Sequence, residues 1–528
     1  MEKKEARIKP QAAPPSGGAI PKTSVANTEG KPEDEKQLID TYDFISNKIP
    51  ISVRIYNKHG DFVPTYAVSI SSISRNTEII LEKIRYELIS QVSLGIADIT
   101  QSKETDHVEE KFRDAIEILV RKHFPDADES TTAFLVSYLI QRSLGMGNVE
   151  ILMSDEKLEE VAINSSDDPV WVYHRKHGWL RTNVVIDSEE TTRHYAATIG
   201  RRIGRQISVL EPLLDAYLNE GDRANATLMP ISTHGNTLTL RKYSRDPFTI
   251  THFLRHNTIN TSAAAFIWLG IQYELSAIIA GGTASGKTAT LNVLASFIPP
   301  NQRILSIEDT RELRLPKFLH WVPMSTRLPN PEGKGGISMA DLLINSLRMR
   351  PDRILVGEVR RQREAETLFE AIHTGHSCYA TFHANNADET IKRLTNPPVN
   401  VPESVLPAIN MLITQFRNRR TGLRRTFQIA EITPDAKCNI LQQYDPKRDI
   451  LQKVGESKTL MDTLRLYTGY TRQEITNSVG ERERILKYLV KQDIDHVDEV
   501  GRIIAEFYKD KDRLMRYVDR NRPFTLDR

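Results

Sequence analysis

The sequence has only two cysteines, Cys378 and Cys438, and they are far apart with no paired spacing. This excludes a disulfide framework and favours a reducing compartment. An excess of one charge is also lacking, because 71 basic and 69 acidic residues give a formal net charge of +2. Global charge therefore gives no reason to expect nucleic acid as a partner.

Long apolar runs are absent as well. The N-terminus is charged and then rich in Pro, Gly and Ser, without the apolar segment of a secretory signal. The most apolar window, residues 263–280, is interrupted by Gln272 and Glu274 and resembles a helix followed by a strand. It is too polar to span a bilayer, so we expect a cytoplasmic protein whose membrane association is peripheral.

The chain of 528 residues is longer than one hydrophobic core usually holds, so three or four domains are expected. Composition and periodicity predict a disordered arm over residues 1–35, a mostly helical N-terminal domain with an opening hairpin over 36–148, a small α/β domain over 149–250, a linker over 251–260, a second α/β domain over 261–440 and a helical C-terminal region over 441–528.

The second α/β domain alternates between strand and helix patterns, which is typical of a parallel sheet covered on both faces. The expected strands are 277–280, 303–307, 353–356 and 377–382, and the expected helices are 288–297, 338–349 and 363–372. Residues 388–528 look helical, with basic segments at 417–420 and 424–425.

The clearest chemical motif is a phosphate-binding loop that matches G-x-x-x-x-G-K-[ST] at every fixed position. It consists of Gly281, Gly282, Thr283, Ala284, Ser285, Gly286, Lys287 and Thr288. An apolar strand pattern precedes it and a helix pattern follows it, which is the context that such a loop requires. The backbone N–H groups and the helix N-terminus would bind phosphate, Lys287 would reach the β/γ-phosphates, and Thr288 would ligate Mg²⁺.

Carboxylates follow two of the expected strands. Glu308 and Asp309 come directly after one strand, at the sheet edge where ligands bind in open α/β folds. Glu358 follows another, and Gly357 stands where phosphate-loop enzymes often have an aspartate. Glu358 is therefore expected to be the carboxylate that interacts with Mg²⁺, through a water molecule. The alternative for Glu308 and Asp309 is a pair of solvated loop carboxylates.

Three histidines bracket the expected strand 377–382: His373, His376 and His383. With Cys378 they suggest zinc, but they interleave with a buried strand and no cysteine pair accompanies them. Ligands to a γ-phosphate are the favoured interpretation, with His376 predicted to bind nucleotide and His383 to take part in catalysis.

Arginines are dense around the second α/β domain, including Arg348, Arg350, Arg353, Arg360, Arg361 and Arg363. One or two are expected to neutralise phosphate, and most to be surface or interface charges. Arg223 and Arg241 in the small α/β domain could act on the nucleotide only across a domain or subunit boundary. For Arg241 the alternative is a strand-end arginine paired with a local carboxylate.

Taken together, these motifs resemble the ATPase superfamily of type II and type IV secretion and type IV pilus assembly, and within it the archaeal branch, including the archaellum motor ATPase. The resemblance covers about residues 149–435. It rests on Gly281–Thr288 (Walker A), Ile307–Glu312 (the Asp box), Leu355–Arg360 (Walker B, with the glycine that is normal for this family), Thr374–His376 with Thr381–Asn385 (the His box), Tyr173–Trp179 and Leu238–Lys242.

The resemblance implies a RecA-like core preceded by a PAS-like α/β domain. It implies a homohexameric ring with ATP and Mg²⁺ between subunits, Glu308 and Glu358 positioning the metal and water, and Arg223 or Arg241 entering a neighbour's site. It further implies docking to a polytopic membrane platform protein, alongside other cytoplasmic motor components. The alternatives are a nucleic-acid translocase, against which the near-neutral charge argues, and a conjugation-type export ATPase.

Overall fold

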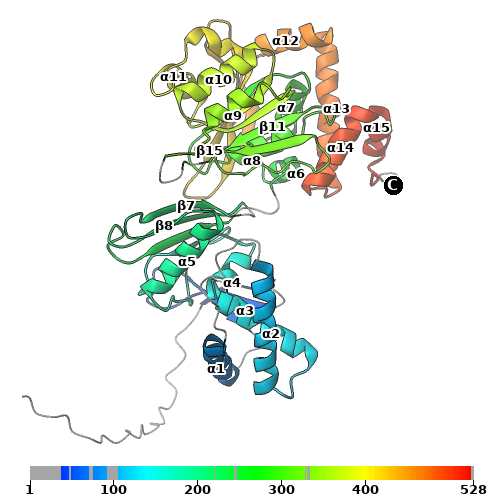
Figure 1. Cartoon of the computed structure of the whole chain (residues 1–528). Helices are drawn as coiled ribbons and strands as arrows, with labels where there is room; N and C mark the ends of the chain where they lie inside the picture. The colour runs from blue at the N-terminus through cyan, green and yellow to red at the C-terminus, as the bar shows by residue number, and fades with distance from the viewer. Residues whose placement is uncertain are drawn as a thin grey trace, which may run out of the picture.

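The computed structural model describes residues 37–524 apart from 47–48, 71–74, 92–104, 145, 219–220, 243–246, 328 and 330–332. The arm expected at residues 1–35 lies outside the described residues. The described chain forms two lobes, each built on a nine-stranded sheet, with the N-lobe (37–242) below the C-lobe (247–524) in Figure 1. The domain boundaries predicted from the sequence stay predictions.

The N-lobe sheet takes its strands from two stretches of the chain. In spatial order they are β1 (Gln37–Ser46), β2 (Ile49–Asn57), β3 (Thr65–Ile70), β6 (Gly178–Thr182), β5 (Trp171–His174), β4 (Leu158–Ile163), β9 (Thr237–Arg241), β8 (Arg223–Thr227) and β7 (Leu213–Tyr217). β3 pairs with β6 in parallel, so the segments 36–148 and 149–250 share one sheet.

The N-lobe helices lie over this sheet and its first hairpin. They are α1 (Arg75–Gln91), α2 (Thr105–His123), α3 (Glu129–Leu144), α4 (Asn148–Ser154) and α5 (Glu189–Arg202). Helices α1–α3 bury one core with Ile49 and Ile51 of β2. Val53 and Ile55 of the same strand join the core beneath α5. Strand β2 therefore contributes side chains to both cores of the N-lobe.

One face of the N-lobe sheet is apolar and the other is polar. Val161, Val172, Leu180, Ala224 and Leu240 are buried in the core with residues of α5. Because side chains alternate along a strand, their neighbours point to the opposite face. Five residues of this opposite face are paired in register across neighbouring strands, from β8 to β6. We call them the facing row: Arg223, Arg241, Glu160, Tyr173 and Trp179.

The C-lobe sheet is parallel at its centre and antiparallel at one edge. The parallel strands are, in spatial order, β12 (Trp321–Ser325), β11 (Ile304–Glu308), β13 (Arg353–Val359), β14 (Ser377–Phe382), β10 (Ala277–Gly281) and β15 (Met411–Arg417). The antiparallel extension is β16 (Arg424–Ile432), β17 (Cys438–Asp445) and β18 (Ile450–Lys453). The four strands expected from the sequence are confirmed.

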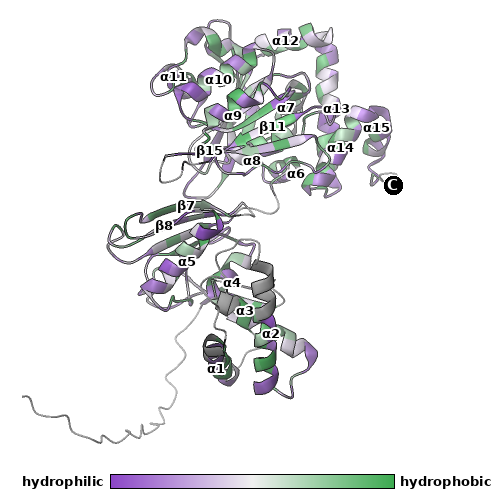
Figure 2. Cartoon of the chain, in the orientation of Figure 1, coloured by the Kyte–Doolittle hydropathy of each residue, from purple (hydrophilic) through white to green (hydrophobic). Residues whose placement is uncertain are grey.

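Helices cover both faces of the parallel strands. One cover comprises α6 (Ile250–Arg255), α7 (Thr261–Gln272), α8 (Lys287–Ala295) and the C-terminal α12 (Thr459–Thr468), α13 (Arg472–Lys491), α14 (Val497–Lys509) and α15 (Lys511–Arg520). The other comprises α9 (Met339–Ser346), α10 (Gln362–His373), α11 (Ala387–Thr395) and the 3-10 turn η1 (Glu403–Ala408). Adjacent residues of β10, Ile278 and Ile279, point into opposite cores, as expected for a strand covered on both faces. In Figure 2 hydrophobic (green) segments gather in the middle of the C-lobe, around the β11 label.

Two expectations from the sequence differ from this fold. The stretch from residue 388 contains β15–β18 as well as helices. The sequence did not predict these strands, because they mix charged and apolar residues and lack a clear alternation. The expected linker at 251–260 contains most of α6, whose Ile250 and Phe253 are buried in the C-lobe core together with Ile259. Among the described helices, none combines the length and apolarity needed to cross a membrane.

Candidate functional site

The phosphate loop, Gly281–Thr288, joins the end of β10 to the start of α8 and has the shape of an anion cradle. Gly286 has φ +97° and Ala284 has φ +58°, so both residues adopt the left-handed conformation. A Cβ at Gly281 would lie 2.9 Å from the carbonyl oxygen of Gln415, so this position requires glycine. Helix α8 begins without a side-chain cap, which leaves its first N–H groups available to an anion.

Two side chains of the loop complete this cradle. The Ser285 hydroxyl is buried without a hydrogen-bond partner. The Lys287 ammonium donates to the Gly282 carbonyl at 3.2 Å and lies 3.4 Å from Nδ1 of His383. Burial lowers the pKa of Lys287, and the nearby charge of Glu358 opposes this shift. An unpaired hydroxyl and a partly desolvated cation at the same loop fit a phosphate group.

Glu308 ends β11 and is the most perturbed carboxyl of the site. Its side chain is 1% exposed. One oxygen accepts the N–H groups of Glu312 (2.8 Å) and Leu313 (3.0 Å), while the other is buried without a partner. Burial raises the pKa of Glu308 to about 7, although the two backbone donors oppose the shift. A buried, half-satisfied carboxyl is where a metal-bound water or a proton would be held.

Glu308 also explains the glycine before Glu358. A Cβ at Gly357 would lie 3.3 Å from both Cα and Cγ of Glu308, so Glu308 fills the space that a side chain at 357 would need. The pairing of β13 with β14 shifts register between Val356 and Val359, which marks a bulge at this point. The site therefore places Glu308 in the space beside β13 that an aspartate at 357 would otherwise occupy.

Glu358 lies at the surface of the site in an ion-pair network with Arg360 and Asp309. The Arg360 guanidinium donates to Glu358 at 2.9 and 2.6 Å and to Asp309 at 2.8 Å. Asp309 also accepts from the Thr326 hydroxyl at 3.1 Å. Arg360, one of the dense arginines noted in the sequence, thus neutralises two carboxylates of the site.

The three histidines do not gather in one place. His383 follows β14 at the phosphate-loop edge, where burial and the charge of Lys287 lower its pKa. His376 precedes β14 and bonds locally to Ala371 and Thr374. A strand of this length separates its ends by roughly 20 Å. This corrects the expectation that both strand-end histidines share one site within a chain.

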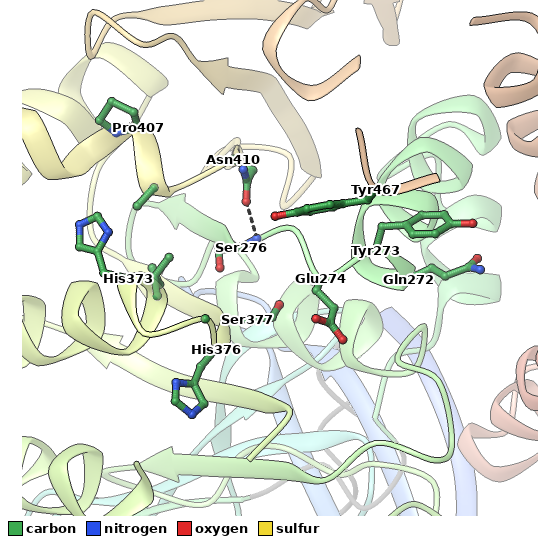
Figure 3. A pocket seen from close by; sticks show the side chains of 13 residues that line it. Gln272, Tyr273, Glu274, Ser276, His373, His376, Ser377, Pro407, Asn410 and Tyr467 are labelled. Atoms are coloured by element: carbon green, nitrogen blue, oxygen red, sulfur yellow. Dashed lines mark hydrogen bonds between the residues drawn. The ribbon is translucent and has the colours of Figure 1, made fainter. Parts of the chain in front are cut away.

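His373 and His376 line a different feature, a pocket of about 550 Å³ at the N-terminal ends of the parallel strands. Figure 3 shows Asn410 and Tyr467 around it, with the Asn410 side chain accepting the Ser276 N–H at 2.8 Å. This edge is opposite the phosphate loop, so the pocket is separate from the site built around Lys287.

The arginines of the N-lobe differ in how they are held. Arg223 forms a two-bond ion pair with Asp215 at 2.9 and 2.7 Å, which raises the pKa of Arg223, and Glu312 of the C-lobe contributes to the shift. Arg241 lies opposite Arg223 and Glu160 in the facing row. Within the described residues Arg241 has no hydrogen-bonded carboxylate, so its guanidinium is less restrained than that of Arg223.

Two residues near the phosphate loop were missed as site residues in the sequence. Asn385 approaches Gly282, at which a Cβ would lie 3.2 Å from the Asn385 amide oxygen. Arg424 donates through Nε to the carbonyl of Ala284 at 3.1 Å. Their motifs were visible, since Asn385 ends the His box and Arg424 belongs to a basic segment. Their approach to the loop depends on tertiary structure.

The arrangement as a whole combines an anion cradle, a lysine and two carboxylates at the carboxyl edge of a parallel sheet. The uncapped helix start and the Ser285 hydroxyl suit phosphate. Thr288 and the carboxylates Glu308 and Glu358 supply the oxygen ligands that Mg²⁺ prefers, directly or through water. The residues present thus fit a magnesium–nucleotide complex.

The chain is similar to several known proteins. Residues 222–423 match the family described as "Type II/IV secretion system protein". The chain is 32% identical over 461 residues to an uncharacterized protein of Methanocaldococcus jannaschii, covering 81% of this chain and 83% of the relative. It is 31% identical over 266 residues to the type IV secretion system protein PtlH of Bordetella pertussis, covering 46% of this chain and 77% of PtlH. Among solved structures it is similar to the ATPase DotB of Legionella pneumophila, with 18% identity, a TM-score of 0.40, and coverage of 68% of this chain and 94% of DotB.

The raised pKa of Glu308 predicts a pH-dependent stability. A pKa of about 7 in the fold, against an ordinary 4.5, favours the protonated carboxyl. The protonated Glu308 carboxyl therefore contributes fully to the free energy of unfolding below pH 4.5, and this contribution is lost as the pH rises through 7. Between pH 5 and 8 the wild type should therefore lose up to about 3 kcal/mol more unfolding free energy than Glu308→Gln.

Urea unfolding of the nucleotide-free protein at both pH values measures this difference. Glu403→Gln, which removes an exposed carboxylate of the same lobe, is the matched control and should behave as the wild type does. Equal pH dependence in the wild type and Glu308→Gln would show that Glu308 ionises normally.

Proposed function

The chain belongs to the type II/IV secretion system protein family, and from this premise we propose that it is an ATPase that hydrolyses Mg²⁺-bound ATP on a RecA-like core. The energy would drive assembly or rotation of a type IV pilus-like filament, or type II/IV secretion, through a polytopic membrane platform protein. The observation that carries the proposal is the phosphate loop with Lys287, faced by the half-satisfied Glu308 and by Glu358.

Each residue has a distinct role in the proposed reaction. The loop N–H groups and Lys287 bind the β/γ-phosphates and hold the nucleotide in place. Glu358 orients the attacking water and accepts its proton, and Glu308 holds a second water at the buried end of the site. Mg²⁺, bound through Thr288, would neutralise charge that develops on the phosphates. His383, beside Lys287, lies where a γ-phosphate contact is expected.

We propose that the chain assembles into a homohexameric ring and acts at the cytoplasmic face of a membrane. An exposed apolar patch on the N-lobe supports assembly between copies: Val209, Leu210, Leu213, Met229 and Ile231 are 63, 94, 66, 45 and 60% exposed. The ring is proposed to meet the membrane through its platform protein and other cytoplasmic motor components. Strong stimulation of ATPase activity by nucleic acid would favour a translocase instead.

Lys287→Ala is expected to abolish ATP hydrolysis, because it removes the cation that holds the β/γ-phosphates. Phosphate release from the purified chain with Mg²⁺ and ATP measures the effect. Lys317→Ala, which removes an exposed lysine of the same lobe, should leave turnover unchanged. Turnover of Lys287→Ala within a few-fold of the wild type would refute the site assignment.

Glu358→Gln should retain nucleotide binding and lose turnover by about 10²-fold or more. The amide can still accept a hydrogen bond from Arg360, which donates to this side chain at 2.6 Å, but it cannot accept the proton of water. Calorimetric titration with Mg²⁺ and ATP, together with phosphate release, separates the two effects. Glu366→Gln on the exposed side of α10 is the control. Loss of binding would indicate a structural role for Glu358.

Arg241 is proposed to act in trans on a neighbouring subunit's nucleotide, where a well-placed arginine contributes ~10³ or more in rate. Its position in the facing row without a hydrogen-bonded carboxylate supports this role over that of Arg223, which Asp215 holds. Arg241→Ala and Lys287→Ala subunits should each be inactive alone. In mixed rings an intact Arg241 can meet an intact phosphate loop, so some activity should return.

The mixing experiment has two controls. Arg181→Ala, which removes an exposed arginine from the same sheet, should keep full activity by itself. Co-purification of differently tagged subunits shows that mixed rings form. If mixed rings remain inactive at every ratio, or if Arg241→Ala alone is fully active, Arg241 does not act in trans.

A further inference from the structure

The hairpin of β15 and β16 contacts both the phosphate loop and the N-lobe. β15 pairs with β10, the strand that leads into the phosphate loop, so that Gln415 is in register with Gly281. The hairpin tip is internally bonded: Asn418 N–H donates to the Leu423 carbonyl at 2.8 Å, and Gly422 N–H donates to the Asn418 carbonyl at 2.9 Å. A tip held in this way moves as a unit with its strands.

One arm of the hairpin holds the phosphate loop. Arg424, the first residue of β16, donates from Nε to the Ala284 carbonyl at 3.1 Å. Ala284 is the non-glycine residue of the loop with a positive φ. Arg424 therefore fixes the orientation of a peptide group in the cradle that would receive the phosphates.

The other arm reaches the N-lobe. Arg417, the last residue of β15, donates to the hydroxyl of Tyr173 in the facing row at 3.3 Å. The ring of Tyr173 packs edge-on against Trp179, with ring centroids 5.4 Å apart. The Arg417 Nε is buried without a partner. Through the hydrogen bond to Tyr173, the end of β15 contacts the N-lobe sheet directly.

The two arginines face each other across the hairpin. Arg417 and Arg424 are paired in register in the β15–β16 ladder. Like charges directly opposite each other destabilise a sheet, so local stability does not account for this pair. Each arginine instead bonds outside the hairpin, one to the phosphate loop and one to the N-lobe.

The tip end of the hairpin is also fixed within the C-lobe. Arg425 forms a two-bond ion pair with Asp449 at 2.6 and 2.7 Å, and Asp449 also accepts from Asn257. Thr426 N–H donates to the Thr258 carbonyl at 2.7 Å. The residues next to the tip are therefore anchored to the C-lobe, while Arg424 and Arg417 contact the phosphate loop and the N-lobe.

We propose that this hairpin couples the phosphate loop to the N-lobe, with Arg424 as a positioning residue for the loop and the Arg417–Tyr173 contact as its N-lobe end. The coupling rests on the proposed nucleotide binding. A coupling free energy acts in both directions, so a change at Tyr173 alters nucleotide affinity although Tyr173 is not part of the cradle. The N-lobe would thereby respond to the state of the phosphate loop.

The test is a double-mutant cycle on the affinity of the full chain for ADP with Mg²⁺, measured by isothermal titration calorimetry. Arg424→Gln and Tyr173→Phe should each change the dissociation constant by about fivefold or more, which is the lower end of measured couplings. The dissociation constant of the double variant should change by less than the product of the two single changes, because both substitutions interrupt the same coupling between Tyr173 and the phosphate loop. Tyr173→Phe keeps the ring against Trp179 and removes only the hydroxyl.

Further variants separate the coupling from loss of charge or of fold. Arg417→Met should act as Tyr173→Phe does, and Arg417→Lys, which restores a donor, should recover most of the wild-type affinity. Arg419→Gln removes an equal charge from the exposed tip and should leave the affinity within about twofold. Hydrogen exchange at the Ala284–Ser285 amides should rise in Tyr173→Phe, while the unfolding midpoint stays at the wild-type value. If Arg424→Gln fails to fold, Arg424→Lys takes its place.

Two results would overturn the proposal, and they differ. If Arg424→Gln weakens ADP binding while Tyr173→Phe and Arg417→Met match the wild type, Arg424 serves the loop alone and the coupling is absent. If the wild type binds Mg²⁺ and ADP no better than Lys287→Ala does, the proposed nucleotide site itself has failed, and the coupling fails with it.

Discussion

A buried carboxyl group with one unpaired oxygen, Glu308, is the constraint on which the rest of the site depends. Burying such a group without full hydrogen bonding is costly, and the raised pKa of Glu308 reflects that cost. Its atoms fill the space beside β13, so residue 357 is glycine. The bulge that follows turns Glu358 outward to Arg360. Glu308 and Glu358 thus occupy a buried and a half-buried position.

Two cations contact the phosphate loop in the described part of the free chain. They are Lys287 and Arg424, whose bond to the neutral Ala284 carbonyl leaves its charge uncompensated, whereas Arg360 is paired with Glu358 and Asp309. A triphosphate carries more negative charge than these two side chains balance. The polar face of the N-lobe sheet, with Arg241 in its facing row, is the natural source of further positive charge. This balance is the physical reason for expecting a site completed between subunits.

The sequence predicted those parts of the molecule whose pattern is local. The strands around Ile278 and Ile354 are short continuous apolar runs, and the phosphate loop has fixed spacing, so the core and the cradle were predictable. The strands β15–β18 were missed although each pairs with the next one along the chain, because they mix charged residues such as Arg424 with apolar ones and lack a clear alternation. The contact of Arg424 with Ala284 joins segments 140 residues apart, and no local signal encodes it. The sequence already placed His376 before the strand 377–382 and His383 after it, and the length of that strand separates the two side chains.

Two buried glutamates, Glu431 and Glu308, differ in how completely their carboxylates are hydrogen-bonded. Glu431 in β16 is fully buried and accepts from Asn439, Ser457 and the N–H groups of Lys458 and Leu460. Burial raises its pKa, but these donors outweigh burial and hold the pKa of Glu431 below its ordinary value. Glu431 is therefore a satisfied anion that ties the start of α12 to the sheet. Glu308 has the same side chain and similar burial, yet it keeps an open oxygen. Among the described residues the second oxygen of Glu308 has no partner, so it has the capacity to accept a hydrogen bond from a water molecule of the proposed site.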